Sequence, residues 1–340
     1  MTTLIKLDSN ENPFGPSPLA IKAMQAALPD CSGYPDDQAS GLRRKLADLH
    51  HASTEQILVT SGLTQLLGML AQTFLGDGLN AVTSERSFIV YEMATRAANA
   101  RLIELPMDQH RFDLNAITSA VDKNTRIVFL ANPNNPTGTL VTADEVEHFL
   151  NRLPDHVVAV LDEAYYEFAA DFALKRRLEY SPALDYVREG SNVVVLRTFS
   201  KVHGLAGVRV GYGIASAKLI TQISRQRAVY SVSNLAQAAA LAALDDEAHV
   251  RKAVKNNTSE SERLLVALSE LGYAAPTPWA NFLYCNLSSD ARKFAERLQR
   301  EGVLVRALDQ WGDPQAIRIT IGTPEQNHAL LRALRRLKDP

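Results

Sequence analysis

The sequence predicts an α/β protein with a mostly parallel central sheet flanked by helices, joined to a smaller α+β domain. The first observation is a series of short apolar runs, rich in β-branched residues, that lack polar alternation. Such runs are typical of strands that helices cover on both faces. The second observation is that helical patterns separate these runs, as in a parallel sheet. The third is a change after about residue 245, where a long polar and amphipathic helical stretch begins.

The predicted elements begin with an extended N-terminal arm, which is rich in Asn, Pro and Gly up to about residue 16. Ser17 is a good helix N-cap and Pro18 suits the first helical position. A helix is therefore predicted from there to about Leu28. A second helix is predicted over 41–51.

The middle of the chain alternates between strands and helices. Thr142 and Glu145 form a capping box that starts one of these helices. Strands are predicted over 57–60, 81–83, 127–131, 157–161, 193–196 and 208–214, with a helix over 64–74. The C-terminal part is predicted as helices over 247–271, 289–301 and 324–337 and strands over 281–285, 303–306 and 317–321. The expected domains are 1–29 (arm and first helix, associated with the small domain), 30–246 (large domain) and 247–340 (small domain).

The composition indicates a soluble, folded chain. Of 340 residues, 46% are hydrophobic and 22% are charged, and the formal net charge is −2. This balance gives no indication of a nucleic-acid or anionic membrane partner. We find no signal-peptide pattern and no apolar run near the ~20 residues of a membrane span. The two cysteines form no motif and the eight histidines show no ligand spacing, so we expect free thiols, a cytoplasmic location and no metal site.

Four motifs carry candidate chemistry, namely 132–138 (Asn-Pro-Asn-Asn-Pro-Thr-Gly), 162–165 (Asp-Glu-Ala-Tyr), 200–201 (Ser-Lys) and 207–211 (Gly-Val-Arg-Val-Gly). Each alone is compatible with a turn or a strand end. Their order is more informative, because the first motif follows one predicted strand, Asp162 closes the next and Lys201 follows a third. Ligands of open α/β sheets bind at the carboxyl ends of strands, so these groups and Arg209 are expected at one crevice. An acid, an amine and a cation together suit the ring nitrogen, aldehyde and phosphate of pyridoxal phosphate.

The sequence resembles the fold-type I, class I and II aminotransferases that depend on pyridoxal phosphate, and within them the histidinol-phosphate aminotransferase branch. The resemblance rests on segments 7–16, 33–36, 132–138, 162–165, 197–209 and 318–323, which occur in the family's order over nearly the whole chain. It implies an enzyme of histidine biosynthesis that moves an amino group from L-histidinol phosphate to 2-oxoglutarate. Two alternatives stay open: an aminotransferase of the same branch for aromatic or other amino acids, and a threonine-phosphate decarboxylase.

The resemblance also implies roles for individual residues. Lys201 would carry the cofactor as a Schiff base and move a proton during the reaction, and Asp162 would keep the ring nitrogen protonated. Tyr165 and Asn135 would donate hydrogen bonds to the 3′-oxygen of the ring. Phe88 resembles the aromatic residue that stacks on the ring, although a plain core residue is the alternative.

The cofactor phosphate is expected at a helix N-terminus, where backbone N–H groups are free. The residues implied in this role are Gly62, Leu63, Thr64, Thr198, Ser200 and Arg209. Many relatives carry an acidic residue in the stretch where Thr64 and Gln65 stand, so side-chain contacts there stay open.

Substrate contacts are implied for Arg318, with Arg306 and Asn12. An arginine here suits either a carboxylate or a phosphate. Tyr34 resembles the tyrosine that reaches the active site of the neighbouring subunit, which implies a homodimer. A structural tyrosine before the Pro35 turn is the alternative.

Overall fold

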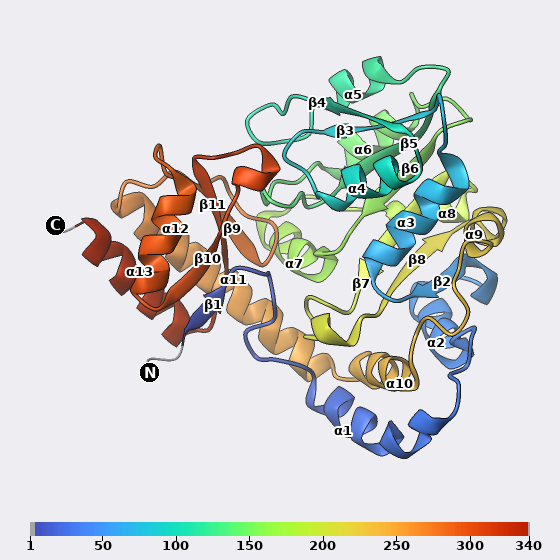
Figure 1. Ribbon diagram of the computed structural model, residues 1–340, viewed down its shortest axis with the longest axis horizontal. Helices are drawn as coiled ribbons and strands as arrows, with labels where there is room; N and C mark the ends of the chain where they lie inside the picture. The colour runs from blue at the N-terminus through green and yellow to red at the C-terminus, as the bar shows by residue number, and fades with distance from the viewer. Residues whose placement is uncertain (1–3, 339–340) are drawn as a thin grey trace.

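The computed structural model describes residues 4–338, which contain a larger and a smaller β-sheet. The larger sheet has seven strands in the order β2-β8-β7-β6-β5-β3-β4 (Figure 1). Their bounds are β2 (Ile57–Thr60), β3 (Asn80–Ser84), β4 (Arg101–Leu105), β5 (Thr125–Ala131), β6 (Val158–Asp162), β7 (Val193–Thr198) and β8 (Gly211–Ala215). β8 is antiparallel to β2 and β7, and the other neighbouring pairs are parallel. The predicted, mostly parallel sheet is therefore confirmed.

Helices flank the larger sheet (Figure 1). They are α2 (Ser40–His50), α3 (Leu63–Phe74), α4 (Val90–Ala97), α5 (Leu114–Ala120), α6 (Ala143–Leu150), α7 (Tyr166–Arg176), α8 (Ala183–Arg188), α9 (Ala217–Ser224) and α10 (Asn234–Ala243). α6 begins at the predicted capping box: the Glu145 N–H donates to the Thr142 hydroxyl, and the Thr142 N–H donates to the Glu145 carboxylate. The central strands β6 and β7 are buried along their whole length, because helices cover both faces.

Two strands of the larger sheet differ from the sequence prediction. β8 begins at Gly211, later than predicted, because Ala206–Val208 forms a 3-10 turn and Arg209 has a left-handed φ of 62°. β4 is not among the predicted strands. It lies at the edge of the sheet, and its exposed Arg101 and Glu104 interrupt the apolar pattern that identifies a buried strand.

The smaller sheet has four strands in the order β1-β10-β11-β9, with its own hydrophobic core. Its strands are β1 (Ile5–Leu7), β9 (Phe282–Asn286), β10 (Val303–Ala307) and β11 (Ala316–Thr320), and its helices are α11 (Glu247–Glu270), α12 (Ala291–Arg300) and α13 (Pro324–Lys338). β1 pairs in parallel with β10, so the N-terminal arm joins the C-terminal sheet. The long helix α11 leads from the larger part of the molecule to the smaller one (Figure 1).

The first helix differs from the expectation that it would join the small domain. α1 (Pro18–Ala27) packs against α10, which belongs to the larger part (Figure 1). Ala20 of α1 is fully buried in the larger hydrophobic core, and this burial explains the placement. Only the strand of the arm, not its helix, therefore joins the smaller sheet.

Within residues 4–338, no helix is both long and apolar enough to cross a lipid bilayer. Both cysteines are free thiols. Cys31 is exposed, and Cys285 is buried on β9.

Candidate active site

A cavity of about 390 Å³ lies at the carboxyl ends of β5, β6 and β7, beside the smaller sheet. Its lining is Ser9, Asn10, Leu63, Thr64, Phe88, Ala131, Pro133, Asn135, Asp162, Ala164, Tyr165, Thr198, Ser200, Lys201, Ala206, Arg209, Arg306, Trp311 and Arg318. The strand ends meet here because parallel strands direct their carboxyl ends to one edge of the sheet. The cavity brings together most of the predicted site residues, including all four chemical motifs.

Asp162 and Lys201 supply the acid and the amine of the cavity. Asp162 is the last residue of β6 and is buried, and this burial raises its pKa to about 6. Lys201 lies in the turn after β7. Burial, helped by the nearby Arg318, lowers the pKa of Lys201 to about 8. The lysine therefore loses its proton at a much lower pH than an ordinary lysine does, which favours its use as a nucleophilic amine.

Tyr165 and Asn135 lie on the side of the cavity that faces the arm and the smaller sheet. The Tyr165 hydroxyl accepts a hydrogen bond from Asn10 Nδ2 at 2.9 Å. The Asn135 side-chain oxygen accepts one from Arg318 Nη1 at 2.6 Å. Asn10 is a site residue that the sequence motifs did not single out. Its place inside the 7–16 segment was the available signal.

The start of α3 and Arg209 form an anion cradle. Gly62 is the N-cap of α3 with a φ of +77°, and a side chain there would overlap the Arg209 guanidinium. The first N–H groups of a helix lack intrahelical partners, so those of Leu63 and Thr64 suit an anion. The hydroxyls of Thr198 and Ser200 line the same cavity. Gln65 accepts a hydrogen bond from the Ser61 N–H at 2.6 Å, so its side chain turns back toward the loop.

Phe88 lines the cavity and meets Tyr91 edge-to-face, with ring centroids 5.7 Å apart. An amine, a buried acid, an aromatic face and a cationic cradle are thus present together. This donor set fits pyridoxal phosphate, whose aldehyde, ring nitrogen, ring face and phosphate each find one matching group.

Two arginines of the smaller sheet complete the cavity. Arg306 on β10 and Arg318 on β11 are directly paired in the strand register. Arg306 forms an ion pair with Asp8 at 3.1 Å. Arg318 is buried, which lowers its pKa to about 10, and its Nε is buried without a partner among residues 4–338. Arg318 thus keeps a positive charge and an unmade hydrogen bond next to the cavity, and both features suit an anionic ligand.

Asn12 was expected to contact the substrate, but the structure does not place it in the cavity lining. Its side-chain amide donates to the Val202 carbonyl at 2.7 Å. Asn12 therefore ties the arm to the turn that carries Lys201.

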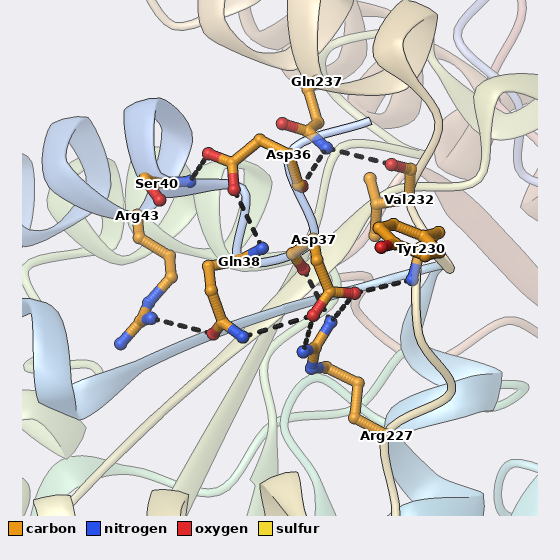
Figure 2. Close-up of polar contacts among 9 residues, drawn as sticks. All are labelled: Asp36, Asp37, Gln38, Ser40, Arg43, Arg227, Tyr230, Val232 and Gln237. Atoms are coloured by element: carbon orange, nitrogen blue, oxygen red, sulfur yellow. Dashed lines mark hydrogen bonds and ion pairs between the residues drawn. The ribbon is translucent and has the colours of Figure 1, made fainter. Parts of the chain in front are cut away.

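Tyr34 lies outside the cavity of its own chain. Its side chain is 83% exposed, and its ring stacks on Tyr230 with centroids 4.6 Å apart. Figure 2 shows how this region is fixed: Asp37 accepts hydrogen bonds from Arg227 and from the Tyr230 N–H. Gln237 donates to both the Asp36 and the Val232 carbonyls, at 2.8 and 2.9 Å. Tyr34 is thus an exposed side chain that stacks on Tyr230, a residue whose backbone N–H is held by Asp37.

The fold and this site define a class of protein: an α/β enzyme whose cavity, at the carboxyl ends of sheet strands, suits pyridoxal phosphate. A model of the family described as "Aminotransferase class I and II" matches residues 2–334, and the chain belongs to this family. The predicted class, a pyridoxal-phosphate-dependent aminotransferase acting on small molecules, is therefore confirmed.

Individual relatives are named more specifically than the family. The chain is 40% identical to a histidinol-phosphate aminotransferase of Moorella thermoacetica, covering 98% of this chain and 85% of that protein. It is also 40% identical to histidinol-phosphate aminotransferase 2 of Pseudomonas fluorescens, with coverage of 98% and 89%. Among solved structures, the histidinol-phosphate aminotransferase of Sinorhizobium meliloti in complex with pyridoxal-5′-phosphate superposes with a TM-score of 0.90 at 28% identity, covering 98% of this chain and 92% of that chain.

Proposed function

We propose that this aminotransferase transfers the amino group of L-histidinol phosphate to 2-oxoglutarate, giving imidazole acetol phosphate and L-glutamate. The relatives named above support this substrate. The main structural support for this substrate is the cross-strand pair of Arg306 and Arg318 in the cavity. A phosphate monoester carries close to two negative charges at neutral pH, and two adjacent guanidinium groups offer it more donors and more positive charge than one would, even with Asp8 paired to Arg306. A carboxylate carries only one charge, and Arg318 alone would suffice for it.

Lys201 is proposed to hold the cofactor and afterwards to move a proton between the substrate carbon and the cofactor. Its lowered pKa supports this role, because the same amine must attack, leave and accept a proton near neutral pH. The bound cofactor supplies an electron sink. Asp162 is proposed to keep the ring nitrogen protonated, and Tyr165 and Asn135 to bind the 3′-oxygen. Their places in the cavity lining support these roles.

The cofactor phosphate is proposed to bind in the anion cradle. The helix N-terminus at Gly62, Leu63 and Thr64 would offer backbone N–H groups, and Arg209 would offer the positive charge. The Thr198 and Ser200 hydroxyls would add hydrogen bonds. Phe88 is proposed to stack on the ring, since it lines the cavity and its edge contact with Tyr91 fixes its orientation.

Tyr34 is proposed to reach the cofactor phosphate in the active site of a second copy of the chain, which makes the enzyme a homodimer. Its exposure and its absence from the cavity lining of its own chain support a role in trans. The hydrogen bonds that Asp37 accepts from Arg227 and from the Tyr230 N–H (Figure 2) support it too, because a side chain that must enter another subunit's site needs a fixed support. Donor and acceptor would use each cavity in turn, in a ping-pong cycle. A cytoplasmic location is part of the proposal and is supported by the two free cysteines.

The test is an absorption titration of the cofactor-loaded enzyme with amines, without any keto acid. L-Histidinol phosphate should convert the absorbance of the lysine-bound cofactor to that of pyridoxamine phosphate at the lowest concentration. L-Phenylalanine, L-glutamate and L-threonine phosphate are the parallel arms. If one of them converts the enzyme at lower concentration, the substrate assignment is wrong and the family assignment stands.

A further inference from the structure

Tyr91 is a buried residue of the first turn of α4 that touches the active-site acid. Its side chain is 1% exposed, and its hydroxyl donates a hydrogen bond to Asp162 Oδ2 at 2.9 Å. The two residues are 71 positions apart in the sequence, so the tertiary fold alone brings them together. Tyr91 is absent from the cavity lining and lies behind it.

The two carboxylate oxygens of Asp162 have different partners. Oδ2 accepts from the Tyr91 hydroxyl, and Oδ1 accepts from the Ala164 N–H at 3.2 Å. A carboxylate with a donor on each oxygen cannot rotate about its Cβ–Cγ bond without losing both bonds. The plane of the Asp162 carboxylate is therefore fixed relative to the cavity.

The ring of Tyr91 is itself held in place. It stacks on Phe129 of β5, with centroids 4.7 Å apart and an interplanar angle of 3°. Phe88 meets it edge-on from the cavity side, with centroids 5.7 Å apart. Both arrangements are favourable for aromatic pairs. The ring thus links the cavity wall at Phe88 to the acid at the end of β6.

The electrostatics favour Tyr91 as a permanent donor. Burial, with the charge of Asp162 adding to it, raises the pKa of Tyr91 well above its ordinary value, so the hydroxyl keeps its proton. Burial raises the pKa of Asp162, and the Tyr91 hydrogen bond opposes this rise by stabilising the anion. Tyr91 therefore favours the charged state of the acid at the pH where burial alone would neutralise it.

We propose that Tyr91 is a positioning residue that keeps Asp162 ionised and aimed at the ring nitrogen of the cofactor. The inference rests on the cofactor site proposed above. Tyr91 would touch neither substrate nor cofactor and would act through Asp162 alone. Without its hydroxyl, the proton shared with the ring nitrogen would move toward Asp162, and the ring would lose the positive charge that makes it an electron sink.

Tyr91→Phe tests the proposal, because it removes the hydroxyl and keeps the stack on Phe129. The variant apoenzyme should bind pyridoxal phosphate about tenfold more weakly at neutral pH, the typical effect of one charge-assisted hydrogen bond. The loss should grow as the pH falls, because Asp162 of the variant takes up its proton at a higher pH than in the wild type. Equilibrium dialysis over a range of pH measures both. An unchanged affinity, or an equal loss at every pH, would overturn the inference.

Tyr212→Phe is the matched control. Tyr212 is also buried, and its hydroxyl lies 3.0 Å from His50 Nε2, outside the cavity lining. Its variant should keep the wild-type affinity and pH profile. The same pH-dependent loss in Tyr212→Phe would count against a specific role of Tyr91.

A cofactor analogue with carbon in place of the ring nitrogen shows whether Tyr91 acts through the charge of Asp162 or only through the shape of the site. This 1-deaza analogue has no cation for Asp162, so the wild type and Tyr91→Phe should bind it equally. If Tyr91→Phe weakens the analogue as much as pyridoxal phosphate, Tyr91 only shapes the site and the inference fails. A wild-type chain that binds no pyridoxal phosphate would instead contradict the proposed function, so the two failures are distinguishable.

Discussion

Arg306 on β10 and Arg318 on β11 are cross-strand partners, and the Asp8 backbone oxygen accepts a hydrogen bond from both guanidinium groups, at 3.4 and 2.8 Å. The arm thus holds the two arginines side by side. The Asp8 carboxylate also pairs with Arg306, so it partly offsets the positive charge of the pair. Two like charges so close together repel each other, and an anionic substrate relieves that repulsion.

The first prediction concerns Arg306. Arg306→Ala should raise the KM for L-histidinol phosphate about tenfold to a hundredfold with a smaller change in kcat, because one charge-assisted contact to the phosphate is lost. L-Histidinol, which lacks the phosphate, should distinguish the variant from the wild type much less. Steady-state kinetics with both amines makes the measurement. Arg332→Ala, at an exposed position on α13, is the control and should leave both substrates unaffected. Equal losses for both amines would contradict phosphate binding by Arg306.

A pair of glycine variants on one helix tests the anion cradle. Gly62→Ala should strongly weaken cofactor binding, because a side chain there would overlap the Arg209 guanidinium and the φ of +77° disfavours any residue but glycine. Gly68 also belongs to α3, and a side chain there would meet open space. Gly68→Ala should keep the affinity and stabilise the helix by about 0.5–1 kcal/mol. Cofactor dialysis and thermal unfolding of the apoenzymes check both variants. Equal cofactor affinity in the two variants would contradict the cradle.

Site residues that lie at the ends of strands were easier to predict from the sequence than residues that only the tertiary fold brings to the site. Asp162 and Lys201 follow apolar runs, so their meeting at one sheet edge was predictable. Tyr91 was not predictable, and Asn10 was marked only by its place in segment 7–16, because each acts through a partner that is distant in the sequence. In the sequence, Tyr91 looks like any aromatic core residue of an amphipathic helix.

The fold shows the same division between local and tertiary information. The buried strands were identified by their apolar runs, whereas the edge strand β4 was missed because its exposed polar residues interrupt the pattern. The start of α1 was identified by its N-cap and its proline. Its packing against α10 depends on a single buried face and was not predictable from local signals.

The lowered pKa of Lys201 predicts how the apoenzyme reacts with its cofactor. Only the unprotonated amine attacks an aldehyde, so the rate of reconstitution should rise with pH through about 8 and level off above it. Burial is the main cause, and the positive charge of Arg318 adds to it. Arg318→Gln should therefore move the midpoint to higher pH. Stopped-flow absorbance after mixing with pyridoxal phosphate measures the rate, and a midpoint near that of a free lysine would contradict the inferred environment.

The exposed Tyr34 and the cavity lysine allow a test of the dimer. Tyr34→Ala and Lys201→Ala should each be impaired alone, the first through weaker cofactor retention and the second through loss of turnover. Co-expression with two affinity tags yields hybrid dimers with one lesion in each chain. If Tyr34 acts in trans, the chain with an intact Lys201 receives an intact Tyr34 from its partner, so each hybrid dimer has one complete site. Purified hybrids should then show about half of the wild-type activity per dimer, an estimate that assumes independent sites.

The opposite geometry gives the opposite result. If Tyr34 served its own chain, neither site of the hybrid would be complete and activity would not exceed that of the impaired Tyr34→Ala parent. The ion pair of Asp37 and Arg227 offers a second lesion of the same kind. Hydrogen bonds from Arg227 lower the pKa of Asp37 to about 2 and keep this pair charged at working pH. Asp37→Ala removes the acceptor that fixes Arg227 and the Tyr230 backbone. It should behave like a milder Tyr34→Ala and be complemented by Lys201→Ala in the same way, because its defect belongs to the neighbouring site.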